Sequence, residues 1–325
     1  MKKILIPFCA IILFACGNNS TQKTENQSVA TVQVPAFNAD SAYFFVKKQV
    51  DFGARVPETS AHKLCADYLK NKLEEYGATA DFHLAKGTLY NGQSVDIKNI
   101  IGNFNPQAKQ RILLCAHWDS RPFADNESDE AKWHTPVLGA NDGASGVGVL
   151  LEVARNLKSL SAEIGVDIVF FDVEDYGAPQ FYQGRHTADS WCIGSREWAK
   201  SAKAADYQAQ FGILLDMVGA PSAKFYKEVE SVRYAANVVE KVWNTAANLG
   251  FDGYFVAKRG GQLIDDHLSI NQIANIPCID IIQFDENSPH NFGAYWHTTT
   301  DDMRNIDRNT LYAVGSTVLN MVFLH

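Results

Sequence analysis

Five motifs with histidine or carboxylate side chains recur along this chain, and most of these motifs come directly after an apolar run of strand-like length. The run at 111–116 is followed by a histidine, the run at 166–171 by an acidic cluster, and the run at 211–215 by an aspartate. Ligand sites of open α/β sheets lie at the carboxyl ends of parallel strands. The pattern therefore predicts a polar site along one sheet edge, built from His117, Asp119, Asp142, Glu174, Asp175, Asp216 and His297.

The length and composition of the chain favour one large α/β domain. Its 325 residues are 46% hydrophobic, which is enough to bury a single core. Helical spacing of apolar residues predicts helices near 40–50, 60–76, 143–157, 195–203, 231–249 and 309–323. The expected buried face of the second helix consists of Ala61, Leu64, Leu69, Leu73 and Tyr76. Strands are expected near 80–85, 97–104, 112–116, 166–171, 211–215 and 279–283. These elements predict a central mixed, largely parallel twisted β-sheet flanked by α-helices.

The N-terminal residues have the pattern of an export signal. Two lysines precede an apolar stretch at 4–14 that is too short to span a bilayer. The residues from Leu13 to Cys16 resemble a bacterial lipobox, which implies cleavage before Cys16 and acylation of its sulfur. We therefore expect a lipoprotein signal peptide at 1–15, a flexible spacer with lipidated Cys16 at 16–36, and a catalytic domain at 37–325. The expected location is the cell envelope, either the periplasmic face or the outer-membrane surface.

Charge and cysteine content exclude some classes of partner and site. The formal net charge of −8 argues against nucleic acid and anionic membrane surfaces as partners, so the lipid is the only expected membrane contact. No Cys-x-x-Cys pair indicates a thiolate metal site. An export pathway would permit disulfides among the cysteines after the signal, and the sequence leaves open whether any forms.

The predicted site contains the residue types of a catalytic zinc centre. Such a centre takes few protein ligands, usually histidine nitrogen and carboxylate oxygen, and keeps one coordination position open. Asp142, Asp175 and His297 supply a set of this kind. Glu174 stands beside one of these ligands without belonging to the set, so it is a candidate to transfer protons next to the metal.

The order of these motifs resembles that of the M28 zinc-exopeptidase family. The resemblance covers nearly all of the chain after the spacer and implies a zinc-exopeptidase or phosphorylase/hydrolase-like fold. It implies that one zinc is held at positions matching His117, Asp142 and Asp216, and another at positions matching Asp142, Asp175 and His297.

Within that family the chain is most similar to the glutaminyl-peptide cyclotransferases, which use one zinc at the second of these sites. The similarity lies in the run from Leu215 to Pro221, in Asp265, and in the spacing of Phe292 and Trp296 before His297. It implies that Asp216 and Asp265 form a hydrogen-bonded acidic pair and that aromatic walls bind substrate. Trp191 matches a substrate-loop tryptophan of the cyclases or packs the rim. One departure is Asp175, because the animal cyclases carry glutamate there.

Three functions are consistent with the sequence. The first is a zinc-dependent glutaminyl-peptide cyclotransferase, which converts N-terminal glutamine of peptides and proteins to pyroglutamate and releases ammonia. The second is an aminopeptidase with two zinc ions, for which His117 and Asp216 would complete the second site. The third is a noncatalytic lipoprotein of the same fold, against which the intact ligand set argues. Of the other histidines, His134, His186, His267 and His290 are expected at the surface or in supporting positions.

Overall fold

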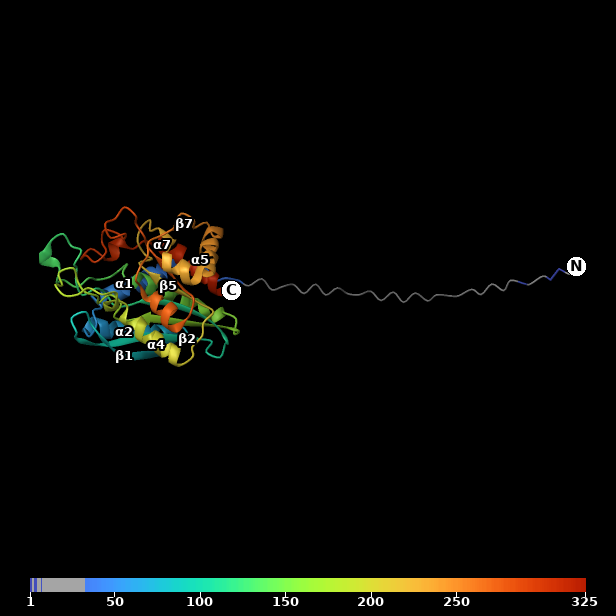
Figure 1. The fold of residues 1–325 in the computed structure, drawn as a ribbon, viewed down its shortest axis with the longest axis horizontal. Helices are drawn as coiled ribbons and strands as arrows, with labels where there is room; N and C mark the ends of the chain where they lie inside the picture. Colours follow the sequence, from blue (N-terminus) through green and yellow to red (C-terminus); the bar gives the residue numbers. More distant parts are fainter. Residues whose placement is uncertain (2, 5–6, 8–32) are drawn as a thin grey trace. The chain divides into compact units, whose positions relative to one another are not determined.

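The structure is a computed structural model, and it describes residues 1, 3–4, 7 and 33–325 (Figure 1). The predicted lipobox with Cys16 and most of the predicted signal peptide and spacer lie outside the described residues, so these assignments stay predictions. Residues 33–325 form one compact unit. Among the helices of the described residues, none is both long and apolar enough to cross a membrane.

The centre of the fold is a six-stranded sheet with the order β1-β2-β4-β3-β5-β8. The pairs β1·β2 and β2·β4 are antiparallel, whereas β4·β3, β3·β5 and β5·β8 are parallel. The predicted central mixed, largely parallel sheet is therefore confirmed. Its strands are β1 (Thr79–Thr88), β2 (Ser94–Phe104), β3 (Gln110–His117), β4 (Ile164–Phe171), β5 (Phe211–Asp216) and β8 (Cys278–Ile282), and a separate small sheet pairs β6 (Phe225–Lys227) with β7 (Phe255–Arg259).

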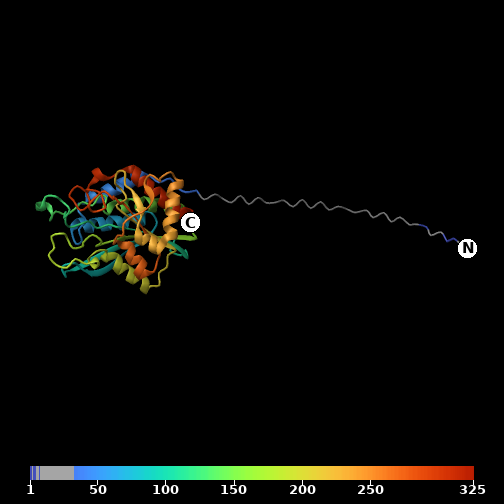
Figure 2. The ribbon, with the colours of Figure 1, turned by 45° about the horizontal axis from the view of Figure 1, so that its top comes forward.

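Helices cover both faces of the central sheet, as Figures 1 and 2 show. Successive side chains of a strand point to opposite faces, so β3 contributes Ile112 and Leu114 to one apolar cluster and Leu113 and Cys115 to another. The larger cluster includes residues of α1 (Ala39–Asp51), α2 (Ser60–Glu75), α3 (Ala144–Asn156), α5 (Val229–Asn248) and α7 (Arg308–Phe323). The smaller cluster lies under α4 (Ile193–Ala204) and a π-helical turn, Ile270–Ala274, which continues α6 (Asp266–Ser269).

Strand register brings the predicted site residues to one edge of the sheet. His117 at the end of β3 pairs with Phe171 at the end of β4, so these two strands end side by side. Asp216 likewise ends β5 and pairs with the last residue of β8. The segments that follow these strands consequently start from neighbouring positions, as parallel pairing requires.

The structure differs from the sequence-based predictions in a few places. Leu64 is 58% exposed, and the buried face of α2 instead includes His62, Cys65, Leu69 and Leu73. The strands β6 and β7 were not predicted, because β6 has only three residues and no measurable alternation. The four cysteines in the described part of the chain are all free and buried.

Close contact between α1 and α3 depends on a glycine. A Cβ atom at Gly148 would lie 2.5 Å from Cγ2 of Val46 and 3.0 Å from the backbone oxygen of Ala42. Because one of these neighbouring atoms is the backbone oxygen of Ala42, a side-chain rotation alone cannot relieve the contact. The absence of a side chain at Gly148 therefore sets how closely the two helices approach.

We expect Gly148→Ala to lower the free energy of unfolding by about 1–3 kcal/mol, since overpacking outweighs the helix-propensity gain of about 1 kcal/mol. Urea unfolding measures the change. Gly253→Ala is the control, because nothing lies within 4 Å of its Cβ position, and it should change stability by no more than about 0.5 kcal/mol. Equal stability of the parent and Gly148→Ala would contradict this account of the helix contact.

Candidate active site

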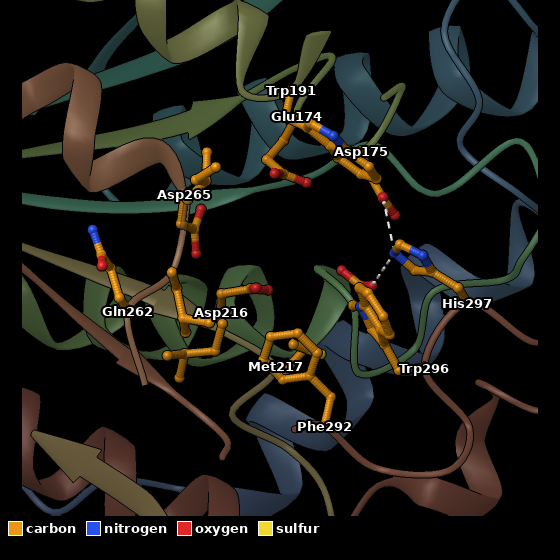
Figure 3. A pocket seen from close by; sticks show the side chains of 14 residues that line it. Glu174, Asp175, Trp191, Asp216, Met217, Gln262, Asp265, Phe292, Trp296 and His297 are labelled. Carbon is orange, nitrogen blue, oxygen red and sulfur yellow. Dashed lines mark ion pairs between the residues drawn. The ribbon is translucent and has the colours of Figure 1, made fainter. Parts of the chain in front are cut away.

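One group of three side chains has the geometry of a metal site. Nε2 of His297 lies 3.1 Å from Oδ1 of Asp175 and 3.6 Å from Oδ2 of Asp142 (Figure 3). All three residues are buried, and one ligand atom from each lies within 4.8 Å of the others. Oδ2 of Asp175 is also buried without a hydrogen-bond partner. An unpartnered buried carboxylate oxygen is costly, and a metal ion bound between these side chains would offset that cost.

A second group shares Asp142 with the first. Nε2 of His117 lies 3.0 Å from Oδ1 of Asp142 and 3.1 Å from Oδ1 of Asp216. The two oxygens of Asp142 thus face different histidines. Burial would raise the pKa of Asp142, but the hydrogen bond and charge of His117, with the charge of His297, hold that pKa below its usual value. Gly143 makes the approach of His117 possible, since a Cβ there would lie 2.3 Å from the ring.

Two buried carboxylates fix the backbone of the two acidic turns. Asp119 accepts the N–H groups of Glu174 and Asp175, both at 3.1 Å. Asp301 accepts the N–H groups of Asp142 and of the residue before it, at 3.1 and 2.9 Å. Nothing in the sequence indicates Asp301, because it is 159 positions from Asp142 along the chain and only the folded loop brings the two residues together.

Glu174 is close to both groups but belongs to neither. Its Oε1 accepts a hydrogen bond from the thiol of Cys192 at 3.3 Å, and its Oε2 lies 3.9 Å from Nδ1 of His117. Burial, together with the charges of Asp175 and Asp265, raises the pKa of Glu174 well above its usual value. A carboxyl with a raised pKa binds a proton more readily than a free carboxyl does, which favours a role as proton acceptor.

These residues line a cavity of about 280 Å³ with aromatic walls. The ring of Trp296 is stacked on His297 at a centroid distance of 3.8 Å, and Phe292 lies 4.8 Å from Trp296. Trp191 is nearly parallel to His297 at 6.0 Å. Every predicted ligand, catalytic and substrate-binding residue lines the cavity except His117, which is buried outside the lining.

Trp191 reaches this wall because the turn beneath it carries no side chain. A Cβ atom at Gly177 would lie 2.1 Å from the indole ring. The backbone at Trp191 is extended, and the next residue, Cys192, adopts a left-handed conformation that begins α4. The loop segment therefore returns to the site as one fixed wall.

The acidic pair predicted from the resemblance lies in the cavity without a direct bond. No hydrogen bond between Asp216 and Asp265 occurs in the described part of the chain, since Oδ1 of Asp216 instead contacts His117. Burial raises the pKa of Asp216 to about 7, and the charges of Asp265 and Asp142 add to that increase. The two carboxyls thus interact through their charge.

A buried histidine lies behind Asp265. His267 is fully buried, with Nε2 at 3.3 Å from Glu228 and Nδ1 at 4.0 Å from Asp280. Burial would raise the pKa of Glu228, but the contact with His267 and the backbone N–H groups of Glu230 and Ser231 bring it to about 2. The expectation of a supporting position for His267 therefore fits its surroundings, whereas His134, His186 and His290 are exposed. The sequence reasoning missed Glu228 and Asp280.

A parallel sheet edge that carries carboxylate and histidine groups around an aromatic cavity defines a metal-dependent enzyme of the α/β class. The family model of peptidase family M28 matches residues 99–322, and the chain belongs to this family.

Solved structures with high similarity to the chain include two described as glutaminyl cyclases. The Tannerella forsythia enzyme is 52% identical, with a TM-score of 0.87, and the match covers 90% of this chain and 100% of that one. The Bacteroides thetaiotaomicron enzyme, bound to N-acetylhistamine, is 49% identical, with a TM-score of 0.88 and the same coverage. Among curated relatives, the Bos taurus glutaminyl-peptide cyclotransferase is 27% identical. The match covers 66% of this chain and 62% of the length of that protein.

We expect Glu228→Gln to destabilise the protein at neutral pH, because the amide has one accepting oxygen where the two carboxylate oxygens of Glu228 accept the backbone N–H groups of Glu230 and Ser231. The folded-state pKa of about 2 lies below the unfolded value of about 4.3. The carboxylate therefore contributes its full stability above about pH 4.3 and loses it as the pH falls towards about 2.

Urea unfolding as a function of pH tests this prediction. The parent should lose stability more steeply on acidification than Glu228→Gln over that range. Glu240→Gln removes a glutamate whose side chain is 58% exposed and pairs with Lys227, so it should leave the slope of the parent nearly unchanged. Parallel curves for the parent and Glu228→Gln would show that the ionised carboxylate of Glu228 contributes nothing to stability.

Proposed function

We propose that the protein is a zinc-dependent glutaminyl-peptide cyclotransferase that acts on N-terminal glutamine of peptides and proteins. The observation that carries the proposal is the aromatic wall against His297, formed by Trp296 at 3.8 Å and Trp191 at 6.0 Å. An uncharged, planar carboxamide fits between aromatic faces, and the cavity of about 280 Å³ suits one small side chain. The relatives described as glutaminyl cyclases support the same activity.

Asp142, Asp175 and His297 would hold the zinc ion, because they converge in a buried group and include an unpartnered oxygen. When bound there, zinc supplies Lewis-acid polarisation of a carbonyl group. Asp175 has a shorter side chain than the glutamate of animal cyclases, and Asp119 fixes the turn that carries it through two backbone N–H groups.

Glu174 would transfer the proton in this reaction. The α-amine of the substrate attacks the γ-carbonyl carbon, and Glu174 accepts a proton from that amine as the C–N bond of the ring forms. The carboxyl then donates the proton to the departing nitrogen, which leaves as ammonia while the carbonyl of pyroglutamate is restored. The raised pKa of Glu174 suits both steps, since the same group must accept and release one proton.

Asp216 and Asp265 would position the substrate amine and stabilise the positive charge that develops on it. Both lie on the cavity wall opposite Trp296 and His297 in Figure 3. Burial and the charge of Asp265 raise the pKa of Asp216, so a cationic group beside these carboxyls is favoured.

We expect the parent protein to release ammonia from a peptide with N-terminal glutamine and to leave a product with a blocked N-terminus. Glu174→Gln should lower kcat by at least about 100-fold, because the amide cannot accept the proton. Zinc content measured by atomic emission should stay at the parental level. Full turnover by zinc-loaded Glu174→Gln would rule out this proton path.

An aminopeptidase with two zinc ions is the alternative, and the intact group of His117, Asp142 and Asp216 favours it. If one zinc suffices, the parent should bind one equivalent and fail to release leucine from a leucyl anilide. Asp216→Asn should then keep that equivalent. Two equivalents in the parent, one in Asp216→Asn and release of free leucine would instead establish the aminopeptidase.

We further propose that the enzyme is exported and attached through Cys16 to a membrane of the cell envelope. The proposal is supported by the basic and apolar N-terminal sequence and the resemblance of Leu13 to Cys16 to a lipobox. The catalytic domain would then meet peptide and protein N-termini outside the cytoplasm.

A further inference from the structure

A buried ion pair lies beside the metal group without belonging to it. Arg121 and Asp125 follow β3 in the loop and are 1% and 3% exposed. Nε and Nη2 of Arg121 donate to the two oxygens of Asp125 at 3.0 and 2.7 Å, which is a bidentate contact. Removing charged groups from water is costly, so a pair buried this deeply needs further contacts to be retained.

Arg121 binds the turn that carries Asp175. Its Nη1 donates to the backbone oxygens of Asp175 and Gly177 at 3.0 and 3.2 Å. The same nitrogen lies 3.7 Å from Oδ1 of Asp175, and the guanidinium is 4.7 Å from the ring centroid of Trp191. One side chain therefore contacts a candidate ligand, its backbone and the aromatic wall.

Asp125 faces the other side of His297. Its Oδ1 lies 3.7 Å from Nδ1 of His297, whereas Nε2 of that ring faces Asp142 and Asp175. A separation of 3.7 Å is an electrostatic contact and not a hydrogen bond. A carboxylate on this side favours the tautomer with the proton on Nδ1, which leaves the lone pair of Nε2 directed at the metal position. Oδ2 of Asp125 also accepts the backbone N–H of Gln180 at 2.9 Å, so the carboxylate is fixed from three sides.

We propose that Arg121 and Asp125 are positioning residues that fix Asp175 and His297 in the geometry of a metal site. This inference rests on the proposed zinc group of Asp142, Asp175 and His297. The pair connects the β3 loop, the turn after β4 and the loop before α7, three segments that are far apart in the sequence. Neither residue lines the cavity, so its effect on substrate passes through the ligands and through Trp191.

The test measures zinc affinity by competition with a fluorescent zinc chelator. Asp125→Asn keeps the size of the side chain and removes its charge, and it should weaken zinc binding by about 10- to 100-fold. Arg121→Lys keeps a positive charge but loses the bidentate contact, and it should weaken binding in the same direction. With saturating zinc, both variants should regain a substantial part of the parental kcat, because Glu174 is unchanged.

The matched control is Asp167→Asn, which breaks another buried bidentate pair away from the cavity. Asp167 accepts from Arg111, with Nε to Oδ2 at 2.6 Å, and its side chain is 2% exposed. This variant should lose stability in the zinc-free state, as Asp125→Asn should, but should keep the parental zinc affinity.

The outcomes separate this inference from the proposed function. Parental zinc affinity in folded Asp125→Asn or Arg121→Lys would overturn the inference while leaving the function intact. Failure of both variants to fold while Asp167→Asn folds would make the pair a stability element only, and would overturn the inference as well. Failure of the parent itself to bind zinc would instead refute the proposed function.

Discussion

The carboxylate of Asp142 faces two imidazoles at once, and the arrangement of the site depends on this contact. Burying a carboxylate is unfavourable unless positive charge or hydrogen-bond donors surround it. Here His117 lies 3.0 Å from one oxygen of Asp142, His297 lies 3.6 Å from the other, and the backbone N–H of Asp142 donates to Asp301. Around this centre further carboxyls are buried at the same sheet edge, and burial together with their mutual repulsion raises the pKa values of Glu174 and Asp216. A bound cation would relieve that repulsion most directly.

The aromatic wall of the cavity depends on a different property, because a glycine without a side chain lies against it. Gly177 leaves room for Trp191, and the stacking of Trp296 on His297 couples the wall to a candidate ligand. Metal group and wall are therefore parts of one packed unit. A substitution that moves the wall would also move the imidazole, so effects on substrate binding and on metal binding should be difficult to separate at these positions.

The sequence predicted the central sheet, the long helices and the charged and aromatic residues of the cavity, because β3, β4 and β5 are largely apolar runs with polar residues at or just after their ends. The prediction failed where the spacing of apolar residues carries no information. Leu64 fits a helical stripe but is exposed, and β6 is too short to show alternation. The supporting groups Asp301, Asp125 and Glu228 were missed for a further reason. Each acts through a contact with a segment distant in sequence, and an isolated aspartate or glutamate in a loop gives no sign of its partner.

Asp301, which holds the backbone of Asp142, and His297 determine when the site is completed during synthesis of the chain. Both residues belong to the last loop before α7, so they are the last parts of the site to be synthesised. A chain that has been made only as far as β8 already contains the strands of the central sheet, Glu174 and Asp175. It lacks His297, and it lacks Asp301, which binds the backbone of Asp142. The group of Asp142, Asp175 and His297 thus stays incomplete in the nascent polypeptide until the loop before α7 has been made.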